Sequence, residues 1–96
     1  MKLLKFYTEK CEPCKQLNSM LSTTLAYTQV KVLNIDAEKE PDACVEFQVR
    51  AVPTLVLVDE FGVEVDRIVG LVTPERLNSF LDEILESLEP VEKNKI

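Results

Sequence analysis

The chain has 96 residues, of which 46% are hydrophobic and 29% are charged, and its formal net charge is −6 at pH 7. This length fits a single domain with one hydrophobic core, and the composition is ordinary for a globular chain. Because no stretch concentrates Lys and Arg, the sequence predicts no binding to nucleic acid and none to an anionic membrane. We interpret the acidity as a solubilising surface.

The N-terminal region carries a short apolar run at residues 3–7 but lacks the long apolar segment and the small-residue cleavage site of a signal peptide. No apolar stretch approaches the length of a membrane span. Three cysteines are too few to stabilise a small secreted fold through disulfides. We therefore expect a cytoplasmic protein without membrane attachment.

Apolar periodicity in the first half of the chain predicts two strands that alternate with two helices. In chain order these are strand 3–7, helix 11–27, strand 30–35 and helix 39–48. Pro13 and Pro41 fall in the first turns of the two helices, where the missing N–H does no harm. The apolar stripe of the first helix is expected to extend to Leu25.

The second half predicts two paired strands and a final helix. The run at 55–58 is typical of a strand buried on both faces, and the turn 59–62 leads to a returning strand that includes Val63, Val65 and Ile68. Thr73 is expected to cap a helix that begins at Pro74, with an apolar stripe reaching Leu88. Residues 1–89 should form the domain, and residues 90–96 a polar tail.

The resulting order is β-α-β-α-β-β-α, which indicates an α/β fold. The first two strands alternate with helices and should pair in parallel, whereas the last two form an antiparallel hairpin. We expect a four-stranded mixed sheet with helices on both faces.

The sequence Cys11-Glu12-Pro13-Cys14 lies where the first strand passes into the first helix. This spacing brings the two sulfurs within disulfide reach, and the helix N-terminus stabilises a thiolate at Cys11. We expect Cys11 to attack a target disulfide and the more shielded Cys14 to resolve the mixed disulfide. Lys10 and Lys15 favour the thiolate while neighbouring glutamates oppose it.

A CxxC pair can also be half of a zinc site. Zinc needs four ligands, and the chain has no histidine and only one further cysteine, so we expect no metal. That third cysteine, Cys44, lies on the apolar stripe of the second helix beside Ala43 and Phe47. We interpret it as a buried, unreactive side chain.

Several segments resemble thioredoxins. The segment Phe6–Lys15 resembles their active-site segment, and Leu33–Asp36 looks like the strand that follows their active-site helix. Val49–Leu55 resembles the segment that carries their cis-proline, and Gly70 matches the glycine before their last helix. The resemblance runs from about residue 3 to 88 in matching order.

The resemblance implies a thioredoxin-like fold and a protein-disulfide reductase that needs no cofactor. It implies a cis Val52–Pro53 bond and a groove beside Cys11, where a substrate strand docks. The expected substrate-binding residues are Lys10, Glu12, Pro13, Val52, Pro53, Gly70 and Leu71. The implied partners are disulfide-containing proteins and a thioredoxin reductase as electron source, with the chain acting as a monomer.

The chain departs from the family pattern at several positions. The extra N-terminal strand and helix of full-length thioredoxins are missing, Lys10 replaces the usual tryptophan, and Glu12 the usual glycine. Lys5 stands where thioredoxins carry a buried aspartate. A charged lysine in a central strand is costly to bury, so Lys5 either reaches water or carries a lowered pKa. Its amine either extends to solvent without affecting the sulfurs or couples to the thiols. Coupling would favour the thiolate and make the protein more oxidising than a counterpart with Asp.

Two other functions stay open. The short chain is also similar to a glutaredoxin-like electron donor, for example to ribonucleotide reductase, although Leu71-Val72-Thr73 differ from the residues that glutathione users tend to carry. The chain could instead be a non-catalytic thioredoxin-fold binding subunit, but the intact Cys11 and Cys14 argue against it.

Overall fold

The computed structural model describes residues 1–22 and 30–88, and the side chains of residues 87 and 88 lie outside that description. The elements in chain order are β1 (Lys2–Tyr7), α1 (Glu12–Leu21), β2 (Lys31–Asp36), α3 (Pro41–Glu46), β3 (Thr54–Val58), β4 (Glu64–Val69) and α4 (Pro74–Leu88). This order confirms the predicted one. The predicted contribution of Leu25, the side chain of Leu88 and the predicted tail 90–96 lie outside the described residues.

The strands form one mixed sheet in the order β2-β1-β3-β4, as the sequence predicts. Parallel pairing of β1 with β2 sets Tyr7 opposite Asp36, and antiparallel pairing of β1 with β3 sets Phe6 opposite Thr54. Strand β4 pairs antiparallel with β3 and sets Val69 opposite Thr54. One end of the sheet therefore contains the carboxyl ends of β1, β2 and β4. The start of β3 lies at the same end.

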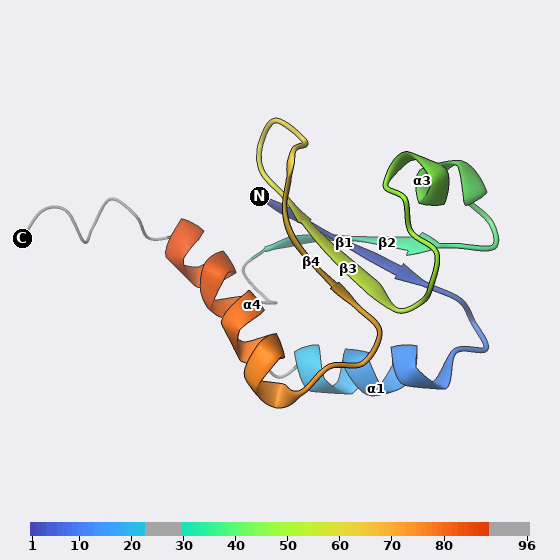
Figure 1. Ribbon diagram of the computed structural model, residues 1–96, viewed down its shortest axis with the longest axis horizontal. Coiled ribbons are helices and arrows are strands. Elements are labelled where there is room, and N and C mark those ends of the chain that lie inside the picture. Colours follow the sequence, from blue (N-terminus) through green and yellow to red (C-terminus); the bar gives the residue numbers. More distant parts are fainter. Residues whose placement is uncertain (23–29, 89–96) are drawn as a thin grey trace, which may run out of the picture.

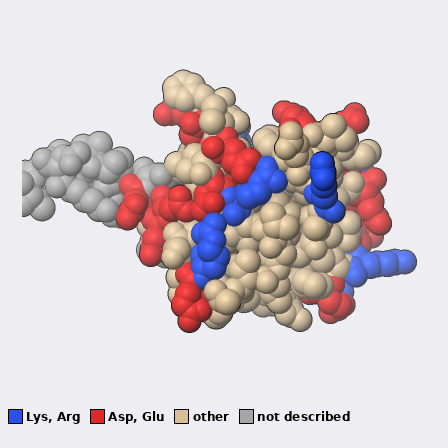
Figure 2. Space-filling model, viewed as in Figure 1, with Lys and Arg blue, Asp and Glu red and all other residues tan. Residues whose placement is uncertain are grey.

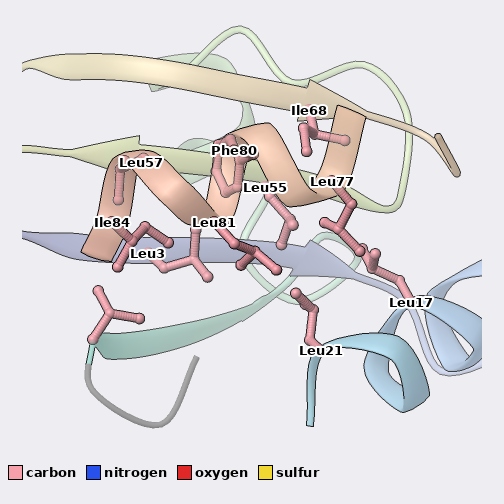
Figure 3. Close-up of a cluster of buried hydrophobic side chains, with 11 residues drawn as sticks. Leu3, Leu17, Leu21, Leu55, Leu57, Ile68, Leu77, Phe80, Leu81 and Ile84 are labelled. Atoms are coloured by element: carbon pink, nitrogen blue, oxygen red, sulfur yellow. The ribbon is translucent and has the colours of Figure 1, made fainter. Parts of the chain in front are cut away.

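Helices cover both faces of the sheet, with α1 and α4 on one face and α3 on the other (Figure 1). The larger core lies under α1 and α4, where Leu17 and Leu21 of α1 and Phe80 and Ile84 of α4 pack against strand residues such as Leu55 (Figure 3). The smaller core lies under α3 and contains Leu4, Phe6, Val56 and Val58. Alternation along β1 and β3 sends successive side chains to opposite faces, so one pair of strands supplies both cores.

Helix α1 is shorter in its described part than the predicted helix 11–27. Cys11 is the N-cap rather than the first helical residue, and the helix ends at Leu21 with Ser22 as its C-cap. Residues 23–29 lie outside the description. Helix α3 is also shorter than the predicted 39–48, because Pro41 begins it and Phe47 caps it, after which Gln48 takes a positive φ of 55°.

The hairpin between β3 and β4 confirms the predicted turn, but the returning strand begins at Glu64, so the placement of Val63 in that strand was wrong. The Asp59 carboxylate accepts hydrogen bonds from the backbone N–H groups of Phe61 and Val63, both at 2.9 Å. These bonds hold Val63 in the turn and prolong it by one residue. Gly62 supplies the positive φ of 82° that the turn needs.

The start of α4 confirms the predicted cap, because the backbone N–H of Arg76 donates to Thr73 Oγ1 at 3.2 Å. Arg76 also donates to both carboxylate oxygens of Asp66 on β4, at 3.0 and 3.1 Å. Burial alone would raise the pKa of Asp66, but hydrogen bonds from Glu83, the Arg67 backbone and Arg76 outweigh burial and lower it. The hydrogen bond to Asp66, together with burial, raises the pKa of Glu83 to about 7.

This carboxyl pair predicts how stability depends on pH. Because the pKa of Glu83 rises from 4.5 to about 7 on folding, its stabilising contribution is complete below about pH 4.5 and is lost as the pH rises to about 7. We expect Glu83→Gln to flatten the fall in the free energy of unfolding over this window, measured by urea denaturation at several pH values. Asp82→Asn, at an exposed position of the same helix, is the matched control. An unchanged slope in Glu83→Gln would contradict the prediction.

Candidate active site

The two cysteines of the CxxC motif lie at the junction of β1 and α1. They form a disulfide with a Cα–Cα distance of 5.2 Å. Both cysteines are buried, with Cys11 9% exposed and Cys14 5% exposed, so Cys14 is the less exposed residue. Both sulfurs therefore lie next to the carboxyl end of β1, at one end of the sheet.

Backbone groups at the start of α1 surround the Cys11 sulfur. The N–H of Cys14 donates to Cys11 Sγ at 3.1 Å, so this sulfur acts as the N-cap acceptor of the helix. The Cys11 backbone N–H in turn donates to the Thr8 carbonyl at 3.4 Å, which ties the cap to the preceding turn. A helix N-terminus stabilises negative charge, so this position favours a thiolate once the disulfide is reduced.

The charged side chains next to the motif largely compensate one another. Lys15 pairs with Glu12 at 3.3 Å, and the side chains are 63% and 76% exposed. Lys39 pairs with Glu9 at 3.8 Å, also on the surface. Exposed pairs of this kind contribute little, so the helix N-terminus is the main electrostatic influence on Cys11.

Two loops lie at the same end of the sheet as the cysteines. The Val52–Pro53 peptide bond is cis, as expected from the sequence. The backbone N–H of Gly70 donates to the Pro53 carbonyl at 2.7 Å, and Gly70 has a φ of 77°. The predicted groove segments are therefore adjacent, and the neighbouring Leu71 is 46% exposed. On the helix side, Lys10, Glu12 and Pro13 are exposed.

Lys5 is held inside the structure, at 8% exposure. Its Nζ donates a hydrogen bond of 2.6 Å to Asn18 Oδ1 on α1. Asn18 itself is exposed, so the amine lies at the border between the core and the surface of α1. Sequence reasoning missed Asn18; the available signal was a polar side chain four residues after Cys14.

The prediction that Cys44 is buried was wrong. Helix α3 contains no buried residue, and Cys44 is a free thiol of intermediate exposure. Its side chain packs against the edge of the smaller core and lines a cavity of about 230 Å³ that also borders Thr8 and Val52. The short helix covers too little of the sheet to enclose its own apolar stripe.

The described residues contain no group of three Cys, Asp or Glu side chains arranged to hold a metal ion. Within residues 1–22 and 30–88, no helix is both long enough and apolar enough to cross a membrane. On the face shown in Figure 2, basic side chains form separate groups between acidic ones and no continuous patch.

One family model matches the chain, and the relatives include thioredoxins and a monothiol glutaredoxin. Residues 1–83 match the thioredoxin family model. The chain is 34% identical over 88 residues to the SPbeta prophage-derived thioredoxin-like protein YosR of Bacillus subtilis, covering 92% of this chain and 99% of that protein. It is 37% identical over 70 residues to thioredoxin of Chlamydia trachomatis, covering 72% of this chain and 68% of that protein.

Solved structures of thioredoxins have the same fold as this chain. Oxidised mitochondrial thioredoxin 3 of Saccharomyces cerevisiae superposes with a TM-score of 0.72 at 30% identity, covering 85% of this chain and 76% of that chain. The family, the fold and a CxxC pair at disulfide distance agree with a redox-active dithiol. The chain therefore belongs to the thioredoxin family and is a thiol–disulfide oxidoreductase.

Proposed function

We propose that the chain reduces disulfides of protein substrates with Cys11 as the attacking sulfur and Cys14 as the resolving sulfur. The observation that carries this assignment is the hydrogen bond from the Cys14 N–H to Cys11 Sγ at 3.1 Å. It gives Cys11 a donor that also stabilises a thiolate. Cys14 lies within the first helical turn and is the less exposed of the two.

The proposed cycle is a dithiol exchange. The Cys11 thiolate attacks one sulfur of the substrate disulfide, and the other substrate sulfur leaves as a thiolate that takes up a proton. Cys14 then loses its proton and attacks Cys11 Sγ, which releases the second substrate sulfur. The substrate disulfide ends as two thiols, and Cys11 and Cys14 end as a disulfide.

We propose that an extended substrate segment docks between the two loops and the start of α1. The adjacency of Pro53 and Gly70, the exposed Leu71, and the exposed Lys10, Glu12 and Pro13 support this groove. Both cysteines and both loops come from one chain, which supports a monomer as the working unit. A thioredoxin reductase is the proposed electron source. The free thiol of Cys44 agrees with a reducing compartment such as the cytoplasm, where the protein would serve electron transport and redox homeostasis.

The electron source is tested by reconstitution. With insulin as the disulfide substrate, we expect NADPH and a thioredoxin reductase to support continuous reduction that depends on the chain. The double variant Cys11→Ser, Cys14→Ser should be inactive and still folded by circular dichroism. Turnover with glutathione and glutathione reductase but not with thioredoxin reductase would instead assign a glutaredoxin-like activity.

The roles of the two sulfurs are tested by trapping. Cys14→Ser should accumulate mixed disulfides through Cys11, because the resolving sulfur is gone, whereas Cys11→Ser should trap nothing through Cys14. Non-reducing gels followed by peptide mass spectrometry identify the linked residue. Faster alkylation of Cys14 than of Cys11 in the reduced protein at neutral pH would overturn the assignment.

Cys44 is expected to be dispensable for turnover. Cys44→Ala should keep full insulin reduction and lower the free energy of unfolding by no more than about 1 kcal/mol, because only part of the side chain is packed. In the folded wild-type protein Cys44 should react with iodoacetamide, since it is partly exposed. A large loss of activity in Cys44→Ala without unfolding would show that a third sulfur takes part.

A further inference from the structure

Lys5 places a positive charge between the sheet and the active-site helix. It lies on β1, an inner strand of the sheet, and is 8% exposed. Its neighbours Leu4 and Phe6 point into the core under α3, so alternation directs Lys5 toward the face that α1 covers. There its Nζ donates to Asn18 Oδ1 at 2.6 Å.

Asn18 follows Cys14 by about one turn on α1, at the exposed border of the buried face that carries Cys14. The two residues are four positions apart, so their Cβ atoms are neighbours on the helix surface, about 5–6 Å apart. The hydrogen bond to Asn18 therefore places the Lys5 amine beside the turn of α1 that follows Cys14. Cys14 itself is 5% exposed, which limits the solvent available to a thiolate there.

We propose that Lys5, held by Asn18, is a positioning residue for the resolving step, in which its ammonium stabilises the Cys14 thiolate. This inference rests on the proposed roles of the two cysteines. In that step the Cys14 thiol releases its proton to solvent and the thiolate attacks Cys11 Sγ. The bond from Cys11 to the substrate sulfur breaks, and the departing substrate thiolate takes up a proton.

The two sulfurs differ in how a thiolate is stabilised. At the N-cap of α1, Cys11 Sγ accepts a hydrogen bond from the backbone N–H of Cys14. Cys14 is the third residue of the helix and is more buried than Cys11, and burial disfavours a charged sulfur whereas an opposite charge nearby favours it. Partial exclusion of water also strengthens the interaction between the ammonium and the thiolate. Lys5 thus supplies at Cys14 the stabilisation that the cap supplies at Cys11.

The other titratable and charged side chains around the motif come from the turn before α1, its first turns and the end of the neighbouring strands. They are Tyr7, Glu9, Lys10, Glu12, Lys15 and Asp36. The Glu12–Lys15 and Glu9–Lys39 pairs lie on the surface. Asp36 accepts backbone hydrogen bonds from residues 38 and 39. None of these groups changes in the variants below, so a difference between variants reports on Lys5 and Asn18.

The test follows the reduced protein by stopped flow with excess 5,5′-dithiobis(2-nitrobenzoate), in a Cys44→Ala background. Attack by Cys11 releases the first thionitrobenzoate, and resolution by Cys14 releases the second. We expect Lys5→Met to keep the first phase and to slow the second about tenfold at pH 7, with its pH midpoint moved up by about one pH unit. Asn18→Ala should slow the second phase in the same direction, and Lys5→Arg should restore most of the rate.

Lys31→Met is the matched control, because it removes one positive charge at the start of β2, opposite Lys2 and at the far end of the sheet. Its second phase should equal that of the background protein. An unchanged second phase in Lys5→Met, or an equal slowing in Lys31→Met, would overturn the inference. A first phase in Cys11→Ser as fast as in the background protein would instead remove the proposed role of Cys11, so the two failures are distinguishable. Thermal unfolding by circular dichroism checks that each variant is folded.

Discussion

The redox site depends on one contact, the hydrogen bond from the Cys14 backbone N–H to Cys11 Sγ. It makes a sulfur the cap of α1, in the place that a serine or aspartate oxygen commonly takes. The same backbone geometry that begins the helix therefore also creates the donor for a thiolate. Any shift of α1 relative to β1 would alter both the start of the helix and the reactivity of Cys11.

The core beneath α1 keeps this contact in place. Leu17 and Leu21 anchor the helix in the larger core, together with α4 and the inner strands (Figure 3). The stripe that buries these leucines also carries Cys14, so packing sets the rotation of the helix and hence which sulfur points inward. The same face of α1 thus anchors the helix in the core and makes Cys14 less exposed than Cys11.

Local patterns predicted the elements and the cysteine site well, because strand periodicity, proline at helix starts and the N-cap at Thr73 are short-range signals. The predictions failed where the outcome depended on coverage by distant parts of the chain. Cys44 lies on an apolar stripe, yet α3 is too short to bury it. The hydrogen bond between Lys5 and Asn18 joins residues 13 positions apart on different elements, so no local sequence pattern predicts it. The carboxyl pair of Asp66 and Glu83 is likewise a product of α4 packing on β4.

Buried polar side chains gather at the catalytic end of the sheet. Among the described residues the buried polar or charged side chains are Lys5, Asp36 and Thr54, and the strand register places all of them in the half of the sheet nearest Cys11. Asp36 accepts backbone N–H groups of the turn after β2, and Thr54 Oγ1 donates to the Ala51 carbonyl at 2.7 Å in the loop before Pro53.

These polar contacts order the surroundings of the site in a way that apolar packing alone would not. A hydrogen bond fixes direction as well as distance, whereas hydrophobic contacts tolerate sliding. At the far end of the sheet Asp59 holds the β3–β4 turn from a partly exposed position, whereas at the carboxyl ends of β1 and β2 the polar side chains that hold the loops are buried. Loops on a rigid scaffold are the usual carriers of function. Lys5 fits this arrangement, because its bond to Asn18 joins the central strand to the helix that carries both sulfurs.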